Sequence, residues 1–163
     1  MKKPIFSIKK LHFLHKKDKI LNINKFDLHR GTMYLFSGSM GSGKSTLMKI
    51  LAKNKNIDSN QLFYEKEDIN KISSSKYYKD VVFLDQTNKK PWLGGLVKNY
   101  MLKKIKVNSR VDSDKILKKI CNTMKIPKYI LDKEIATLSE GEFRWINLSI
   151  SIAIDSKILI IDY

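Results

Sequence analysis

Residues 38–45 read Gly-Ser-Met-Gly-Ser-Gly-Lys-Ser, the most informative stretch of this 163-residue chain. They fit the pattern G-x-x-x-x-G-K-[ST], after the apolar run Met33–Phe36 and before the helix-spaced Leu47, Ile50 and Leu51. In a strand–loop–helix context, glycines let successive backbone N–H groups point at phosphate oxygens, and the helix dipole adds positive charge there. The stretch therefore predicts a phosphate-binding loop, with a Gly/Ser-rich turn and a chance lysine as the alternative.

The polar side chains of this loop have separate expected roles. Lys44 is expected to reach the β- and γ-phosphates of a nucleotide. Ser45 is expected to offer its hydroxyl to Mg²⁺, because this hard cation prefers oxygen ligands. The predicted nucleotide contacts are Gly38, Ser39, Gly41, Ser42, Gly43, Lys44, Ser45 and Thr46.

The last apolar run, Ile158–Ile161, is followed by Asp162. A strand of this kind delivers one carboxylate to the edge of an open α/β sheet, where such sheets bind ligands. Asp162 is expected to hold a water on Mg²⁺. Any buried strand can end in aspartate, so this pattern supports a Mg²⁺ site only in combination with the phosphate-binding loop.

The other strands are predicted from short apolar or alternating runs. Pro4–Ile8 and Ile20–Leu28 are typical of a small antiparallel sheet, with a polar turn at residues 16–19 between them. Gln61–Tyr64 is a further candidate strand. Three runs have the pattern of parallel strands that are buried on both faces: Met33–Phe36, Asp80–Leu84 and Ile158–Ile161.

Helical spacing dominates the second half of the chain. From Leu96 to about Ile130, apolar residues recur mostly at three and four positions, with a loop at residues 107–113. Ser139, with Glu142 at the third helical position, predicts a capping box and a helix that runs to about Ile154. The chain is therefore expected to belong to the α/β class.

The formal net charge is +16, and lysine supplies 29 of the 32 basic residues. A strongly basic surface attracts phosphate backbones and anionic surfaces. Base-edge and bidentate phosphate recognition, however, favour the planar fork of arginine. We therefore expect a solvated lysine surface first, attraction to anionic lipid headgroups or an acidic partner second, and specific nucleic-acid binding last.

Two further motifs resemble those of a known family. Leu138–Glu142 reads L-S-E-G-E and is similar to the L-S-G-G-Q signature of ATP-binding cassette (ABC) ATPases. Gln86 lies where that family has its Q-loop glutamine. From Lys44, the glutamine, the signature serine and Asp162 follow at intervals of 42, 53 and 23 residues, close to those of ABC transporter cassettes. The resemblance covers essentially the whole chain.

The resemblance implies a fold and its division into parts. The fold is a P-loop NTPase of ABC type with an N-terminal antiparallel β-subdomain, a parallel core sheet and an inserted α-helical subdomain, and with the C-terminal part of the core missing. Residues 1–163 would form one incomplete ABC ATPase domain. Its expected parts are the antiparallel β-subdomain at 1–30, the core from P-loop to Q-loop at 31–90, the helical subdomain at 91–137, and the signature helix and Walker B strand at 138–163.

The resemblance also implies roles for single residues. Gln86 would contact the attacking water and Mg²⁺. Ser139 and Gly141 would contact the γ-phosphate bound by an opposite subunit. Phe13 or His15 would occupy the aromatic site that stacks on adenine; Phe13 is chemically the better candidate, with packing in the N-terminal sheet as the alternative.

The chain departs from the family pattern at three positions. Glu140 replaces a glycine and Glu142 a glutamine of the signature, which adds like charge near the γ-phosphate. Tyr163 stands where the family has the glutamate that polarises water, and a phenol with a pKa of about 10 is a poor base at neutral pH. The family continues with a D-loop, a further strand and a switch histidine. Three interpretations of the chain therefore stay open. It is a gene remnant, it is part of a longer chain, or a partner completes it.

The function implied by the resemblance is that of an ABC transporter subunit. It would bind ATP and Mg²⁺, pair with a second cassette as a homodimer or heterodimer, and couple nucleotide state to a membrane permease from the cytoplasmic side of the membrane. Trp92 and Leu93 would contact that permease, unless Trp92 is core. The alternative is a non-hydrolysing ABC-like remnant or regulatory protein, which Tyr163 favours. A third interpretation, a nucleic-acid-associated ABC protein, is supported by the net charge alone.

Overall fold

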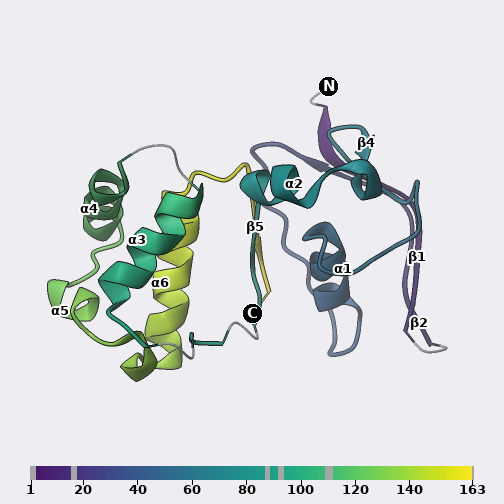
Figure 1. Cartoon of the computed structure of the whole chain (residues 1–163). Helices are drawn as coiled ribbons and strands as arrows, with labels where there is room; N and C mark the ends of the chain where they lie inside the picture. Colours follow the sequence, from purple (N-terminus) through teal and green to yellow (C-terminus); the bar gives the residue numbers. More distant parts are fainter. Residues whose placement is uncertain (1–2, 16–17, 87–88, 92–93, 109–111, 163) are drawn as a thin grey trace. The chain divides into compact units, whose positions relative to one another are not determined.

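The computed structural model describes residues 3–15, 18–86, 89–91, 94–108 and 112–162. It divides into two compact units, which are described separately. The first comprises the chain as far as Tyr78 together with Asp162, and the second comprises Lys79–Ile161. Figure 1 shows the elements of both along the chain.

The first unit contains a four-stranded antiparallel sheet with the order β2-β1-β3-β4. Its strands are β1 (Pro4–His15), β2 (Asp18–His29), β3 (Leu62–Tyr64) and β4 (Glu67–Asp68). Phe6 lies opposite Tyr64 and Ile8 opposite Leu62, and all four side chains are buried. Their burial removes apolar surface from water, which is the main force that holds this sheet together.

Two helices complete the first unit. Helix α1 (Lys44–Leu51) buries Leu47, Ile50 and Leu51, as its spacing predicts. A 3-10 turn (Ile69–Lys71) leads to α2 (Ser74–Asp80), which was not predicted. The buried Tyr77 of α2 packs edge-on against Tyr64 of the sheet, with ring centroids 5.3 Å apart, and its hydroxyl donates to the carbonyl oxygen of Leu51. The end of α1 is thereby tied to the sheet through α2.

Two predictions for the first unit need correction. The run Met33–Phe36 was expected to be a buried parallel strand, but it forms no ladder with another strand in the described residues, and Met33 and Leu35 are 96% and 90% exposed. Tyr34 and Phe36 instead pack on Phe26 of β2, with centroids 6.1 Å away in each case. Without a neighbouring strand, alternate side chains of an extended run have nothing to bury them.

The second correction concerns β1, which continues well past Ile8 to His15. The sequence predicted a strand that ends at Ile8. In the structure, Lys9 pairs with Lys25 and the register continues to Phe13 opposite Leu21. An antiparallel sheet can present one face to water, so surface lysines do not interrupt it.

The second unit combines a parallel strand pair with a helical part. Strands β5 (Val81–Leu84) and β6 (Ile158–Ile161) pair in parallel from Val81–Ile158 to Leu84–Ile161. Both are partly buried rather than buried on both faces. The helices are α3 (Val97–Asn108), α4 (Ser113–Thr123), α5 (Lys128–Leu131) and α6 (Glu140–Ala153), with a 3-10 turn at Ile135–Thr137.

The helices of the second unit share one apolar core. It is built from Val97, Met101 and Ile105 of α3, Leu117 and Ile120 of α4, and Phe143, Ile146 and Ile150 of α6. These positions follow the three- and four-residue spacing on which the helices were predicted. In the part of the chain that the structure describes, no helix has both the length and the apolar character needed to cross a membrane.

Candidate nucleotide-binding site

The side chain of Lys44 folds back and bonds to the predicted phosphate-binding loop. Its Nζ donates to the carbonyl oxygens of Gly38 at 2.8 Å and Ser39 at 2.9 Å, and lies 3.3 Å from Oγ of Ser42. The backbone N–H of Ser42 donates to the Ser39 carbonyl oxygen at 3.2 Å, which makes a turn. An ammonium group has three donors, and here all three meet atoms of the loop itself.

Two glycines are required by this geometry. Gly38 has φ +157°, and a Cβ there would lie 2.9 Å from Ser42 Oγ. Gly43 has φ +89° in the left-handed region and is the N-cap residue that precedes helix α1. Residues with side chains rarely adopt either conformation. The glycines of the motif are therefore explained by close approach and by backbone conformation.

The first turn of α1 is open. No side chain caps its N-terminus, because the N-cap residue Gly43 has no side-chain acceptor, and Ser45 and Thr46 follow directly in the helix. The first N–H groups of a helix have no partner within the helix and attract anions. This arrangement is that of an anion-binding helix start.

Ser45 contacts an acidic residue far away in the sequence. Ser45 Oγ donates a hydrogen bond to Oδ1 of Asp162 at 3.0 Å, across 117 positions. The Asp162 side chain is only 6% exposed, whereas Ser45 is exposed. A hydroxyl and a carboxylate oxygen are both ligands that Mg²⁺ accepts, so this pair fits the cation expected there. The structure thus brings together the two side chains that the sequence separately predicted as parts of a Mg²⁺ site.

The other predicted site residues are placed as follows. Phe13 is half-buried on β1, and Nζ of Lys55 lies 5.1 Å from its ring centroid. Gln86 is exposed after β5 and belongs to the second unit, as do the signature residues. Trp92, Leu93 and Tyr163 lie outside the described residues, and so does the side chain of His15.

The signature residues form the start of α6. Ser139 caps the helix by accepting from the Glu142 N–H at 3.1 Å, and Glu142 Oε2 accepts from the Ser139 N–H at 2.6 Å. The predicted capping box is confirmed. A Cβ at Gly141 would have nothing within 4 Å. Glu140 pairs with Arg144 one turn later, at 3.3 Å.

Two lysines that sequence reasoning missed hold this helix start. Lys133 Nζ donates to Glu142 Oε1 at 3.0 Å, and Lys90 Nζ donates to the carbonyl oxygen of Leu138. The Ser139 N–H and then Lys133 lower the pKa of the Glu142 carboxyl to about 2. Neither lysine has a local sequence signal, because both act through tertiary contacts.

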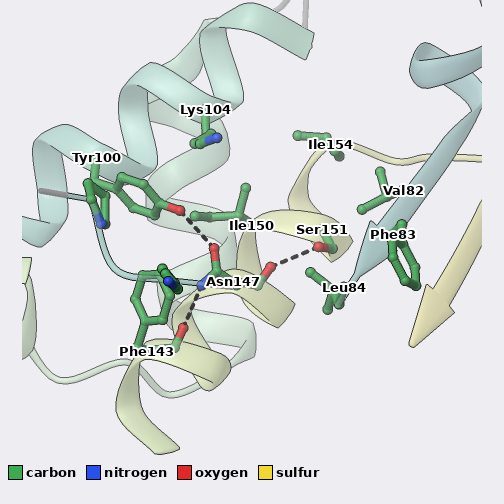
Figure 2. Close-up of a pocket in the computed structure, with 12 residues that line it drawn as sticks. Val82, Phe83, Leu84, Tyr100, Lys104, Phe143, Asn147, Ile150, Ser151 and Ile154 are labelled. Atoms are coloured by element: carbon green, nitrogen blue, oxygen red, sulfur yellow. Dashed lines mark hydrogen bonds between the residues drawn. The ribbon is translucent and has the colours of Figure 1, made fainter. Parts of the chain in front are cut away.

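A hollow of about 360 Å³ lies within the second unit, and we call it the α3–α6 hollow. Figure 2 shows Tyr100 and Lys104 on α3, Asn147, Ile150 and Ser151 on α6, and Val82 and Leu84 on β5 around it. Lys89 and Pro91, which follow the Q-loop position, also line it. No sequence pattern predicted this cavity.

The fold and the loop define a P-loop nucleotide-binding protein. Residues 21–163 match the profile of a family described as ABC transporter. The chain is 31% identical over 160 residues to a probable iron export ATP-binding protein, FetA, of Escherichia coli, with 98% of this chain and 70% of that protein covered. The chain therefore belongs to the ABC transporter family, as an ATP-binding subunit.

Further comparisons agree on the fold. The energy-coupling factor transporter ATP-binding protein EcfA1 of Staphylococcus aureus is 22% identical, over 99% of this chain and 61% of its own length. The structure of cbiO1 from Clostridium perfringens, part of the ABC transporter complex cbiONQ, has a TM-score of 0.73 at 21% identity, over 98% of this chain and 65% of that one. A bacterial Atm1-family ABC exporter with ATP bound has a TM-score of 0.78 at 18% identity, over 98% and 29%. This chain thus spans less than two thirds of EcfA1 and cbiO1.

Proposed function

We propose that this chain binds MgATP through residues 38–46 and Asp162 and passes the nucleotide state to membrane permease subunits. The observation that carries the proposal is the 3.0 Å hydrogen bond between Ser45 and Asp162. In phosphate-binding loops the serine after the lysine is a Mg²⁺ ligand, and an acidic residue after an apolar strand completes the cation site. Family membership supports ATP as the nucleotide.

The chain's own residues would divide the work of binding. The N–H groups at the start of α1 and the ammonium of Lys44 would bind phosphate oxygens, and Gly38 and Gly43 would keep the loop close to them. Ser45, Asp162 and Gln86 would hold Mg²⁺, which when bound neutralises charge on the β- and γ-phosphates. Phe13 would stack on adenine.

The same proposal covers partners and location. A second cassette would present its Ser139 and Gly141 to the γ-phosphate, and residues 91–137 would act as the helical subdomain that contacts the permease. The α3–α6 hollow, beside the Q-loop position, supports a contact surface in that region. The protein would then lie on the cytoplasmic face of the membrane. The neighbour cbiO1 is part of a transporter complex, which is consistent with this arrangement.

Calorimetric titration with MgATP tests the proposal. Lys44→Ala removes a charge-assisted hydrogen bond of about 1.5 to 3 kcal/mol, so ATP affinity should fall by roughly 10- to 150-fold. Lys71→Ala, which removes an exposed lysine of the same unit outside the loop, should bind ATP like the parent chain. Equal affinity of the parent chain and Lys44→Ala would contradict the proposal.

The second candidate function is ATP binding without turnover. Tyr163 favours it, because the position has no carboxylate to polarise water. Glu140 and Glu142 add negative charge at the helix start that would meet the γ-phosphate. Such a protein would regulate by binding and release alone, and the turnover measurement described in the Discussion separates it from a slow ATPase.

A further inference from the structure

A second hollow, of about 620 Å³, lies on the antiparallel sheet of the first unit, and we call it the β1–β2 hollow. It is lined by residues of β1, of β2 and of the segment before β3: Lys9, Lys10, Asn24, Lys25, Ser59, Asn60 and Gln61. Among the described residues, this lining includes neither a carboxylate nor an apolar side chain. Ligand pockets of about 300 to 1,000 Å³ are usually mostly apolar. A wholly polar lining therefore favours a small and strongly hydrophilic ligand.

The geometry of the two strands gathers the lysines of this hollow. Strands β1 and β2 lie side by side (Figure 1), and Lys9 is directly opposite Lys25. Side chains of a strand normally alternate between its two faces, but here Lys9 and Lys10 are both exposed, as are Asn24 and Lys25. Lys10 has φ +49°, in the left-handed region, which interrupts the alternation along β1. Three ammonium groups therefore line one hollow.

This arrangement of lysines is unfavourable without an anion. Like charges directly opposite each other on neighbouring strands repel, and the lining residues Lys10 and Asn60 (φ +65°) both have a positive φ. Backbone strain of this kind is common at ligand sites. The ion pairs of the described residues include none of the three lysines, and Lys9 Nζ lies 4.7 Å from the centroid of the Phe63 ring. A bound anion with several charges would offset the repulsion between the lysines.

Uncharged polar groups complete the lining. They are the amides of Asn24, Asn60 and Gln61 and the hydroxyl of Ser59. Gln61 Nε2 donates to Oδ2 of Asp58 at 3.4 Å, but Gln61 Oε1 is buried and accepts from no donor of the described residues. Buried acceptors are nearly always paired, so this one favours a ligand that carries hydroxyl groups. Asp58 itself does not line the hollow.

We propose that the β1–β2 hollow binds a small phosphorylated polyol with at least two phosphate groups, such as a sugar bisphosphate. The lysines would bind phosphate oxygens as point charges, and the amides would bind polyol hydroxyls. The described lining has no aromatic platform for nucleobases and no apolar side chain to enter a membrane. It also shares no residue with 38–46 or Asp162, so the proposal is independent of the proposed function.

Calorimetric titration of the full chain with fructose 1,6-bisphosphate tests the proposal. The buffer contains neither nucleotide nor Mg²⁺. The matched ligands are fructose 6-phosphate, which has one phosphate fewer, fructose, which has none, and pyrophosphate, which has no hydroxyl-bearing carbon. Every titration is repeated with Lys44→Ala, which separates the hollow from the phosphate-binding loop.

The expected result is an order of binding set by phosphate and hydroxyl groups. Fructose 6-phosphate should bind about 2- to 12-fold more weakly than the bisphosphate, as expected for one hydrogen-bonded charge, pyrophosphate should also bind more weakly, and fructose should not bind. Added salt should weaken binding, because the lysines are exposed. Lys10→Gln and Lys25→Gln should each weaken bisphosphate binding by about 2- to 12-fold. Lys71→Gln, on an exposed lysine of the same unit outside the hollow, should bind like the parent chain.

Several results would overturn the proposal. They are no binding of the bisphosphate, equal binding of the bisphosphate and fructose, unchanged binding in both Lys10→Gln and Lys25→Gln, and loss of binding in Lys44→Ala, which would place the ligand in the phosphate-binding loop. Tighter binding of phosphatidylglycerol vesicles or of an oligothymidylate through the same lysines would also overturn it. Failure of the proposed function would look different, because it appears in the ATP titration and leaves bisphosphate binding intact.

Discussion

Helices α1 and α6 both begin at a predicted phosphate-contacting motif, but their first turns are built differently. At α1 the N-cap is Gly43, and no side chain makes a capping hydrogen bond at the helix start. At α6 the N-cap Ser139 and Glu142 bond to each other reciprocally, and Lys133 holds the carboxylate from the side. The start of α1 can accept an anion, whereas the start of α6 already holds the carboxylate of Glu142.

The difference follows from two residue choices. Glycine at an N-cap supplies a left-handed conformation and no acceptor, which leaves the first N–H groups for a ligand. Serine and glutamate at N-cap and N3 satisfy two of those N–H groups internally. We therefore expect α1 to dominate nucleotide affinity, while the start of α6 contributes mainly to the stability of the second unit.

The largest expected effect is on the rate of ATP turnover. An open α1 would bind phosphate but supplies no general base, and the position after Asp162 is Tyr163. A general base contributes about 10²- to 10⁴-fold, and a normal cassette turns over ATP at roughly 1 to 10 s⁻¹. Without the base and its orientation of water, the chain should turn over ATP below about 10⁻² s⁻¹, and Tyr163→Glu should be at least about 10²-fold faster. Phosphate release is the measurement, with Lys44→Ala as the contamination control. A Lys44-dependent rate of about 1 s⁻¹ in the parent chain would show that another residue or a partner acts as the base.

A pair of glycine substitutions sharpens the comparison. Gly38→Ala puts a side chain on a residue with φ +157° and brings its Cβ within 2.9 Å of Ser42 Oγ. If the loop shifts to relieve about 1 to 3 kcal/mol of strain, ATP binding should weaken by about 5- to 150-fold. Gly141→Ala meets no atom within 4 Å and lies in a helix, so it should stabilise the chain by about 0.5 to 1 kcal/mol. Calorimetry and urea unfolding measure the two. Weaker ATP binding in Gly141→Ala than in Gly38→Ala would reverse the comparison.

Removing the cap of α6 should act on stability alone. Ser139→Ala deletes the acceptor for the Glu142 N–H and should cost about 1 kcal/mol in urea unfolding of the second unit. ATP affinity of the single chain should be unchanged. Ser113→Ala, in the first turn of α4 where Asp112 is the cap, is the matched control and should cost less. Loss of ATP affinity in Ser139→Ala would mean that the two helix starts are coupled within one chain.

The smallest expected effect is on folding stability at acidic pH. The folded-state pKa of Glu142 is lowered to about 2, so this carboxylate stabilises the chain above its unfolded pKa of about 4.3 and loses that contribution as the pH falls toward 2. The stability difference between the parent chain and Glu142→Gln should therefore shrink across that window. Lys133→Met should keep the larger part of the pH dependence, since the Ser139 N–H is the main cause. Urea unfolding at a series of pH values checks both, and a difference independent of pH would contradict the assignment.

Local features were predictable because their causes lie within a few residues. The loop at residues 38–45, the helix that follows it and the Ser139–Glu142 capping box depend on close neighbours, and each is present in the structure. The α/β class and the parallel pairing of β5 with β6 also follow from apolar runs of the right length. The buried strand at Met33–Phe36 was wrong, because burial depends on a neighbouring strand that a local pattern cannot supply.

The amino-acid sequence alone determined which helix start lacks a side-chain cap and which has a capping box, since glycine positions and caps are properties of single residues and their neighbours. Only the tertiary structure decided which distant groups meet: Ser45 with Asp162, Lys90 with the carbonyl oxygen of Leu138, and α3 with α6 around a hollow. These contacts join residues far apart in the chain, and their formation depends on how the apolar faces of helices and strands pack. Packing depends on the shape of all the side chains together, which no single motif encodes.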